Sequence, residues 1–537
     1  PADITLLTDS SVTAALSILD QPPFGFLTKA GRAVDIAEGR AKVRADLRLV
    51  LANKLKPDQV DYRVSGDLTG IRSDRIVPGR ALLADRLTLS ATRAGMRIEG
   101  PGTLSGVPFQ ALWRQDFGPE NRGRSRVVGQ VELSPTFLDA FGIALPEGSV
   151  RGAGRADLTL DVAAGSSVAF RLTSDLAGIG LSIPGLAWTK PANGRGRLEV
   201  EGTLGKPPSV EKIVLTAPGL DAEGSVTLRA DGSLEAARFP SFDLGWFKGG
   251  VTLAGNGKGR LPDLSIDSGT ADLRRAAFAA GPKGSASLPI AVSLDRLTVS
   301  EGIALTGFLG EFSTGGGFNG RFTGSVNGAA PVAGTVAPLT NGTGVRIGSK
   351  DAGAVMRAAG IFTRGRGGAL DMTLRPRKTT GVYDGDLTIR NIRVVDAPVL
   401  AELLGAVSVI GLLEQLNGSG ILFGDVQGKF LLTPDAVEIS EGSAIGASLG
   451  VSGQGVYRSD TRIVDLRGTI SPIYLLNGIG TIFSKSREGL FGFNYRLQGP
   501  ADGPTVSVNP LSILTPGMFR EIFRSPPPKL QPDEPSQ

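Results

Sequence analysis

The segment Gly446-Ala-Ser-Leu-Gly450 fits the G-x-S-x-G pattern that surrounds the nucleophilic serine of many hydrolases. A serine of that kind needs an imidazole to accept its proton, and the chain contains no histidine. It contains no cysteine either, which leaves no thiol nucleophile and no imidazole or thiolate ligand for a metal. We therefore interpret the pattern as a coincidence in a glycine-rich strand.

Carboxylates are the main remaining side chains that could support acid–base chemistry. Asp384 and Asp386 form one candidate pair, and Glu438 and Glu441 form another. The distance between two carboxylates decides whether they can act together in a glycosidase, and a sequence does not give that distance. We expect both pairs to lie at solvated strand positions. The sequence thus predicts no enzyme, no catalytic residue, no metal site and no cofactor.

The composition favours a folded β protein over a nucleic-acid-binding one. The 537 residues include 57 Lys and Arg against 52 Asp and Glu, a formal net charge of +5. Basic and acidic residues are interleaved along the chain, which is a weak case for nucleic acid. Glycine occurs 76 times, about twice its usual share, and its even spread indicates frequent turns and strand bends.

Short runs of alternating apolar and polar residues recur about every 10 to 15 residues, separated by Gly, Pro, Asn or Asp. On the order of 30 strands would form a ribbon roughly 140 Å wide, which is too many for one closed sandwich. Two arrangements remain open: a solenoid or sandwich whose apolar face is its core, and an open U-shaped sheet whose apolar face lines a groove. Examples of the runs are residues 60–64, 197–201, 225–229, 386–390 and 505–508.

Four segments break the strand pattern and predict short helices. The longest, residues 396–416, begins with Asp396 and Pro398, which are common at helix N-termini. Its uncharged part is far shorter than the roughly 20 residues needed to cross a membrane, so we expect it to pack on the sheet or close the groove. The other three segments are residues 134–142, 351–362 and 516–524, and residues 525–537 form a Pro-rich tail that is predicted to be disordered.

The alternation is clearest near the end of the chain, in residues 490–524. An apolar or aromatic side chain occupies every second position from Phe491 to Leu497, with Gly492, Asn494 and Arg496 between them. Such a period of two places the aromatic side chains on one face of a strand. A slip of one residue would invert that face, so the phase of the alternation is the point on which the prediction depends.

Several stretches carry a resemblance to a known family. Residues 182–191 read SIPGLAWTKP, residues 396–404 read DAPVLAELL, and residues 408–413 read SVIGLL. Residues 470–480 read ISPIYLLNGIG, residues 488–495 read EGLFGFNY, and residues 508–520 read VNPLSILTPGMFR. The chain resembles the AsmA-like superfamily of bacterial envelope proteins, specifically the YhdP-like branch with an AsmA-like C-terminal region, in its alphaproteobacterial form. The match is specific from about residue 382 to residue 524 and mainly architectural before residue 135.

The resemblance implies an all-β protein built on a very elongated, twisted, U-shaped antiparallel β-sheet that forms a hydrophobic groove, with a few short amphipathic helices. It implies a bridge-like lipid transfer protein that conducts phospholipid across the periplasm between the inner and outer membranes. The expected anchor is an N-terminal inner-membrane segment absent from this chain. Residues 1–380 would form the groove, residues 381–524 the AsmA-like C-terminal region, and residues 525–537 the tail.

The expected partners are phospholipid acyl chains along the groove, and membranes or membrane proteins at its ends. The helices of the C-terminal region are predicted to close the groove or to contact a membrane or a partner. The residues predicted to line the groove are Leu387, Ile389, Phe491, Phe493, Tyr495 and Leu497. The residues predicted to make helix contacts are Leu403, Leu404, Val407, Phe519 and Phe523.

Two other functions remain open on the sequence alone. A non-catalytic envelope scaffold or outer-membrane assembly factor could share the same fold. A β-solenoid that binds or cleaves polysaccharide would need a regular rung period, and the runs here are too irregular for a fixed repeat.

Overall fold

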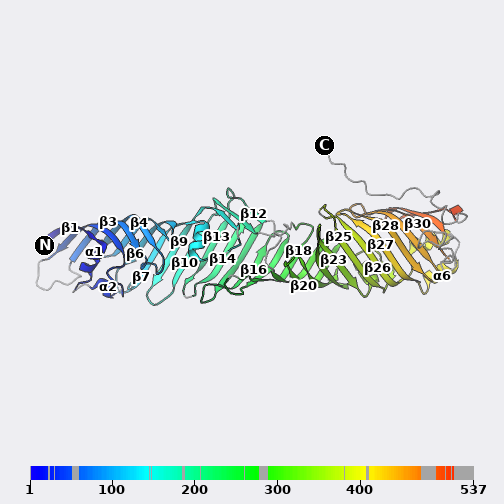
Figure 1. Ribbon diagram of the computed structural model, residues 1–537, viewed down its shortest axis with the longest axis horizontal. Coiled ribbons are helices and arrows are strands. Elements are labelled where there is room, and N and C mark those ends of the chain that lie inside the picture. Colours follow the sequence, from blue (N-terminus) through cyan, green and yellow to red (C-terminus); the bar gives the residue numbers. More distant parts are fainter. Residues whose placement is uncertain are drawn as a thin grey trace, which may run out of the picture. The chain divides into compact units, whose positions relative to one another are not determined.

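Strands make up 63% of the structure and helices 9%, so the prediction of an all-β protein is confirmed. A long, mostly antiparallel sheet carries a few short helices (Figure 1). The computed structural model describes residues 2–21, 25–29, 31–50, 60–143, 145–146, 148–183, 188–205, 207–258, 260–276, 288–379, 381–406, 410–472, 492–501, 503–509 and 511–512.

The chain divides into two compact units. Unit 1 contains Pro1–Asp263 and Ala276–Gly281, and unit 2 contains Leu264–Arg275 and Pro282–Gln537. The division falls inside the region predicted to form one groove, residues 1–380. The expected boundary between residues 380 and 381 lies within unit 2 and stays a prediction.

Unit 1 is an antiparallel meander in which most strands pair with the next one along the chain. The hairpin between β5 and β6 shows the turn chemistry, because both of its loop residues, Ser105 and Gly106, have positive φ angles, as a tight two-residue turn requires. The paired strands are β1 (Ala2–Ser11), β2 (Glu38–Leu49), β3 (Val60–Ser73), β4 (Leu82–Thr92), β5 (Gly95–Leu104), β6 (Val107–Asp116), β7 (Arg124–Leu133), β9 (Gly154–Ala163), β10 (Val168–Ser174), β13 (Arg197–Leu204), β14 (Ser209–Ala217), β15 (Leu220–Leu228), β16 (Leu234–Asp243) and β17 (Phe247–Ala254).

Three short strands of unit 1 form a second sheet. They are β8 (Val150–Gly152), β11 (Ile179–Ile183) and β12 (Trp188–Lys190), with β11 in the centre. The small sheet is tied down by Lys190, whose Nζ is buried and donates hydrogen bonds to the carbonyl oxygens of Leu176 (2.8 Å) and Ile179 (2.7 Å). A buried ammonium is stable only with such acceptors, so this lysine has a structural explanation.

Unit 2 is also a meander, except that β18 (Asp263–Asp272) pairs in parallel with β19 (Pro289–Ser300). The other strand pairings described in this unit are antiparallel. The remaining strands are β20 (Ile303–Ser313), β21 (Asn319–Val326), β22 (Ala330–Leu339), β23 (Gly342–Ser349), β24 (Gly365–Arg366), β25 (Ala369–Pro376), β26 (Tyr383–Val394), β27 (Ile421–Leu432), β28 (Ala436–Gly446), β29 (Gly450–Arg458), β30 (Ile463–Ser471), β31 (Phe493–Pro500) and β32 (Thr505–Asn509).

Two of the predicted helices form where their capping residues indicated. Helix α3 (Pro135–Phe141) follows Ser134, starts with proline and ends at Gly142, which adopts the left-handed conformation that favours glycine. Helix α4 (Ala352–Ala358) is capped by Asp351, whose side chain accepts a hydrogen bond from the backbone N of Ala354 at 2.8 Å.

The other helices differ from the prediction. Residues 396–416 form two helices, α5 (Pro398–Ala406) and α6 (Ile410–Asn417), where a single one was expected. The expected helix at residues 516–524 lies outside the described residues. Helices α1 (Val12–Leu19) and α2 (Phe26–Lys29) were not predicted. The signal for α1 was Ser11, whose side chain accepts a hydrogen bond from the backbone N of Ala14 at 3.1 Å.

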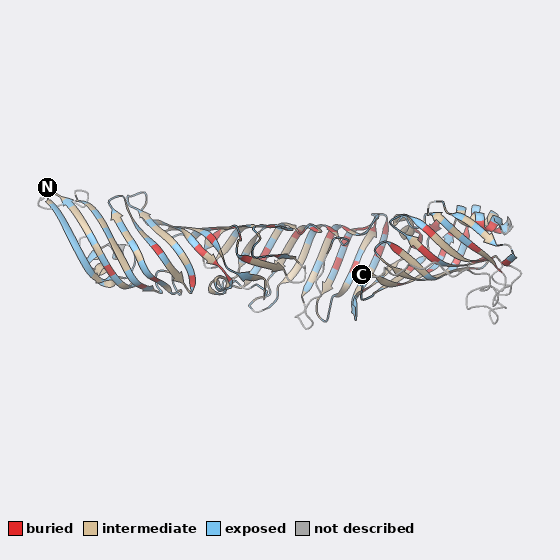
Figure 2. Ribbon diagram, turned by 90° about the horizontal axis from the view of Figure 1, so that it is seen from above, coloured by how far each residue is buried: buried red, intermediate tan, exposed pale blue. Residues whose placement is uncertain are grey.

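The fully buried residues gather where helices or the small sheet cover the main sheet. In unit 1, Val12 of α1 packs with Ala41, Ile71 and Ala84, and a second cluster joins α3 and the small sheet to β6, β7 and β9. In unit 2, one large cluster lies between α4, α5 and α6 and strands β25 to β32. Elsewhere along the strands most positions are half-buried or exposed (Figure 2), with further buried side chains on β19 to β21 such as Leu294, Phe308 and Phe322.

Candidate functional site

The register of unit 2 places apolar residues opposite one another on one face of the sheet. We call this surface the apolar face and the opposite surface the charged face, and use the same terms for unit 1. One row of directly paired residues, the unit 2 row, crosses fourteen strands from β18 to β32 without a charged side chain. Its members are Ile266, Val292, Gly310, Phe322, Gly334, Ile347, Met372, Leu387, Gly428, Gly442, Gly453, Gly468, Tyr495 and Val508.

Four consecutive members of this row are glycines, which form a strip without side chains. We call Gly428, Gly442, Gly453 and Gly468 the glycine furrow; all four are half-buried. A Cβ added at Gly428 would have, among the described residues, only Leu387 and Glu441 within 4 Å. The furrow is therefore open above Gly428. At its other end the Tyr495 hydroxyl lies over it, 3.3 Å from a Cβ added at Gly453 and 2.7 Å from one added at Gly468.

Five of the six predicted groove residues lie on this face. A neighbouring row runs from Leu370 through Ile389, Val426, Ala444, Val451 and Ile470 to Phe493, so Ile389 and Phe493 share the face with Leu387 and Tyr495. Leu497 lies opposite Leu466 on the same side. Ile389 and Tyr495 are buried, whereas Leu387, Phe493 and Leu497 are half-buried against the same cluster. Phe491 lies outside the described residues, and the groove-lining role itself stays a prediction.

Tyr495 is the one hydrogen-bonding side chain in the unit 2 row. Its hydroxyl donates to the carbonyl oxygen of Ser452 at 2.8 Å, and burial raises the pKa of this phenol above its usual range. The hydroxyl is thus held by the sheet in its neutral form, and it adds no charge to the apolar face.

Helices α5 and α6 cover one part of the apolar face. Leu403 and Leu404 of α5 are 3% and 0% exposed and belong to the same cluster as Ile389 and Tyr495. Helix α5 contacts β32 and α6, and α6 contacts β27, so the two helices lie across the face between strands far apart in the chain. Leu403 and Leu404 therefore contact their own sheet. Their predicted contact with a membrane or partner stays a prediction, and Val407, Phe519 and Phe523 lie outside the described residues.

Unit 1 repeats this two-faced arrangement. Its own row of directly paired residues, the unit 1 row, also crosses fourteen strands, from β1 to β17, and contains no charged side chain. Its members are Thr8, Val43, Gly66, Leu89, Ile98, Trp113, Val127, Leu160, Phe170, Gly202, Val210, Val226, Ala237 and Leu253.

The charged face carries the ion pairs. Arg377 lies 2.7 Å from Asp384, and Lys429 lies 3.0 Å from Glu441. Hydrogen bonds from the Arg377 guanidinium hold the pKa of Asp384 below its usual value. Asp386 is paired with Arg375 on the same face. Asp384, Asp386 and Glu441 are thus each paired with a neighbouring cation on the charged face.

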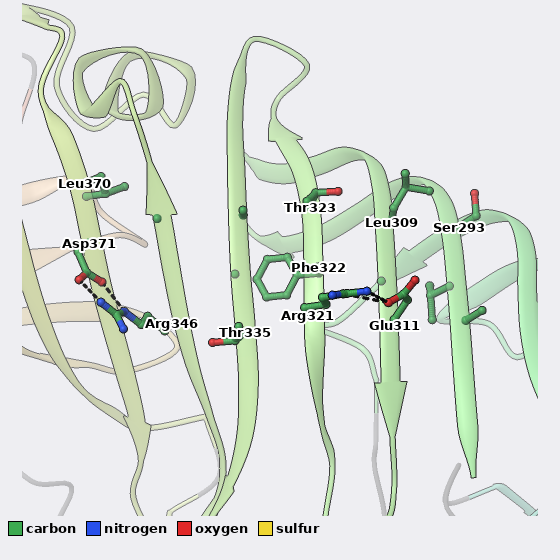
Figure 3. A pocket seen from close by; sticks show the side chains of 16 residues that line it. Ser293, Leu309, Glu311, Arg321, Phe322, Thr323, Thr335, Arg346, Leu370 and Asp371 are labelled. Carbon is green, nitrogen blue, oxygen red and sulfur yellow. Dashed lines mark hydrogen bonds and ion pairs between the residues drawn. The ribbon is translucent and has the colours of Figure 1, made fainter.

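A shallow hollow of about 970 Å³ lies over strands β19 to β25 and is lined mainly by side chains of the charged face (Figure 3). Two ion pairs project from its floor, Glu311 with Arg321 at 2.5 Å and Asp371 with Arg346 at 2.6 Å. Thr335 lies between the two arginines, directly opposite both. Because each guanidinium already has a carboxylate partner, the hollow offers no free charge to a ligand.

The described part of the chain contains neither a metal-binding cluster nor a membrane-spanning helix. Within those residues, no group of three or more acidic side chains could hold a metal ion. None of the described helices is long and apolar enough to cross a membrane. Comparison with protein-family models, with curated proteins and with solved structures found no match.

Sequence reasoning missed the glycine furrow. The signal was present, because the runs around Gly428, Gly442, Gly453 and Gly468 each place a glycine in the apolar phase of the alternation. What the sequence lacks is the register that sets these four glycines side by side. Bulges between paired residues of β27 and β28, and of β28 and β29, shift that register and are not visible in the pattern.

Proposed function

We propose that the chain binds phospholipid acyl chains along its apolar faces, as part of a bridge-like lipid transfer protein of the AsmA-like, YhdP-like kind. The observation that carries this proposal is the pair of charge-free rows, each crossing fourteen strands. A half-buried apolar surface in contact with water costs about 25 cal/mol per Å² relative to one that is covered. Acyl chains would remove that cost, and headgroups would stay in water.

The geometry of the furrow supports movement of lipid as well as its binding. Backbone and apolar side chains offer an acyl chain dispersion contacts that differ little from strand to strand. No described charged or amide side chain stands in the row to stop it. A lipid would then pass along the face down any free-energy difference, and the chain itself would need neither catalysis nor a cofactor. In the cell this would place the chain in the periplasm, between the two membranes.

The first experiment compares two adjacent residues on opposite faces of β26. Leu387→Asp places a carboxylate in the unit 2 row, and Thr388→Asp places the same charge on the charged face. Protein purified without detergent is extracted, and its phospholipid is quantified by mass spectrometry. We expect bound phospholipid in the wild type and in Thr388→Asp, and a loss of at least about tenfold in Leu387→Asp, because a buried or half-buried carboxylate strongly disfavours apolar ligands.

A second readout separates binding from folding. Transfer of fluorescent phospholipid between donor and acceptor vesicles is measured for the same three proteins, beside their melting temperatures. A wild-type protein that carries no phospholipid and transfers none would contradict the proposal and favour the scaffold function. Equal loss in both variants would show that charge anywhere on β26 acts through folding.

A further inference from the structure

Like charges lie directly opposite one another at few places on the charged faces: Asp221 with Asp243 in unit 1, Arg467 with Arg496 in unit 2, and a run of three arginines in unit 1. Arg97 on β5 lies directly opposite Arg114 on β6, and Arg114 lies directly opposite Arg126 on β7. Side chains at such positions have Cβ atoms about 4.5–5.5 Å apart, and like charges at this spacing destabilise a sheet. We call these three residues the arginine column.

Elsewhere on the charged faces, directly opposite charges often have opposite signs. Asp3 lies opposite Arg48, with Arg48 Nε 2.8 Å from the carboxylate. Lys429 lies opposite Glu441 at 3.0 Å. The arginine column departs from this pairing of opposite charges. Because the departure lowers the stability of the sheet, it is a candidate for a functional feature.

Only one end of the column is neutralised. Arg126 Nε lies 2.5 Å from Asp161 Oδ1 on β9. In the described part of the structure, Arg97 and Arg114 have no carboxylate within 4.0 Å, and their guanidinium groups make no hydrogen bond. Both side chains are exposed. Two guanidinium groups on adjacent strands thus remain available to an anion from solution.

Hydroxyl groups extend the column on its other side. Ser90 on β4 lies directly opposite Arg97, and Ser65 on β3 lies directly opposite Ser90. Serines and arginines therefore form one row of hydrogen-bond donors over five successive strands, about 19 Å across, before Asp161 is reached. The hollow of unit 2 differs, because Arg321 and Arg346 there already hold carboxylates.

The number of oxygens decides which anion suits this row. A carboxylate has two oxygens and satisfies one guanidinium, as Asp161 does for Arg126. A phosphate group presents more oxygens and up to two charges, so it can accept hydrogen bonds from two neighbouring guanidinium groups at once. Spacing of about 4.8 Å between adjacent strands is compatible with such a bridge.

We propose that the arginine column is a phosphate-binding site, in which Arg97 and Arg114 share one phosphate group and Ser90 adds a hydroxyl donor. The ligand is a phosphate-bearing anion, either a phospholipid headgroup or a soluble phosphate. Bound phosphate neutralises the two unpaired arginines and removes their mutual repulsion. The site lies on the charged face, opposite the unit 1 row, and it does not rest on the proposed acyl-chain function.

The test uses the whole chain and two probes at low ionic strength. Inorganic pyrophosphate binding is measured by calorimetry, and co-sedimentation is measured with phosphatidylglycerol vesicles beside phosphatidylcholine vesicles. The variant R97Q/R114Q removes two charges from the column. The matched control R321Q/R346Q removes two charges from the charged face of unit 2, where both arginines are already paired.

We expect R97Q/R114Q to weaken binding of at least one probe by tenfold or more, and R321Q/R346Q to change it by less than twofold. Binding of phosphatidylglycerol vesicles alone identifies a lipid headgroup as the ligand, and binding of pyrophosphate identifies a soluble phosphate. The melting temperature of R97Q/R114Q should equal or exceed that of the wild type, because repulsion is removed. Absence of binding by the wild type, or equal loss in both double variants, overturns the proposal.

Discussion

Aromatic rings and glycines share the apolar face of unit 2 in a repeated pairing. The ring of Phe322 lies over Gly334, and the ring of Phe430 lies over Gly385. In both cases the ring occupies the space that a side chain on the opposite strand would take, and it shields the backbone there. The aromatic rings thereby lie flat over glycine positions on the sheet, and they do not stand up from the apolar face.

Gly428 permits a direct test of the furrow, because an added Cβ there would be 3.8 Å from Leu387 Cβ and 3.9 Å from the carbonyl oxygen of Glu441. We expect Gly428→Leu to fold with a melting temperature within about 2 °C of the wild type, since these are ordinary contacts. The new side chain would stand in the furrow and lower phospholipid transfer between vesicles by roughly threefold or more, because it displaces part of the acyl-chain path.

Two other glycines of unit 2 provide the controls for that substitution. At Gly348 on the charged face, an added Cβ would have only the Leu370 carbonyl oxygen nearby, at 3.5 Å, so Gly348→Leu should fold and leave transfer unchanged. At Gly442 it would be 2.8 Å from the carbonyl oxygen of Gly453, so Gly442→Leu should destabilise by about 1–3 kcal/mol. Normal transfer by a folded Gly428→Leu protein would count against the furrow as a lipid path.

At the scale of elements, helix α5 is held by the sheet that it covers. Val399, Leu400 and Ala401 pack against the large cluster of unit 2, and Leu404 is completely buried within it. Glu402 on the same helix is exposed. A carboxylate introduced at Leu403 or Leu404 would therefore destabilise unit 2, whatever its effect on a membrane contact.

The contribution of α5 can be measured with Leu404→Ala. We expect it to lower the free energy of unfolding of unit 2 by about 2–5 kcal/mol, because it removes buried methyl groups and leaves a cavity. Glu402→Ala, on the exposed side of the helix, should change that free energy by less than about 0.5 kcal/mol. Urea denaturation of both variants gives the comparison, and equal stability of the two would show that α5 does not pack as described.

Helices were predicted well where capping residues in the sequence mark their ends. Ser134, Pro135 and Gly142 mark both ends of α3, and Asp351 marks the start of α4. The separation of α5 from α6 was missed because the apolar run through residues 403–413 continues across it. Helix α1 was missed because it follows β1 directly, with no glycine or proline between them.

The site was less predictable than the fold, because it depends on pairing between distant strands. Alternation alone placed Phe493, Tyr495 and Leu497 on one face, and the register places Leu387 there as well. The positive φ of Asn391 and the neighbouring gap in the pairing between β26 and β27 change the phase inside a strand. The alternation of apolar and polar residues does not reveal a change of phase of this kind. Neither the two rows nor the arginine column could therefore be assembled from the sequence.

For the whole molecule, the ionisable groups predict a characteristic dependence of stability on pH. The chain has no histidine, so no side chain with an ordinary pKa titrates between about pH 5 and 8. Hydrogen bonds from arginines hold the pKa values of Asp371, Asp384 and Asp465 below their usual value of 3.8. Carboxylates of this kind stabilise the fold above the unfolded-state pKa, and that stabilisation is lost as the pH falls through the folded-state pKa.

We therefore expect the urea midpoint to be nearly constant from about pH 5 to 8 and to fall below about pH 4. Asp465→Asn should lower the midpoint at pH 7, where Arg496 would lose its partner at 3.0 Å, and should matter less near pH 2, where the wild-type carboxyl group is protonated. A step in stability near pH 6 would contradict this account.

The meander gives each unit a modular length. Most strands pair only with their two neighbours in the main sheet, so one hairpin can be gained or lost while the pairing of distant strands stays the same. Each added hairpin would lengthen the charge-free row by two positions and widen the sheet by about 9.6 Å. Duplication of single hairpins is thus a simple evolutionary route by which the length of such a sheet could change.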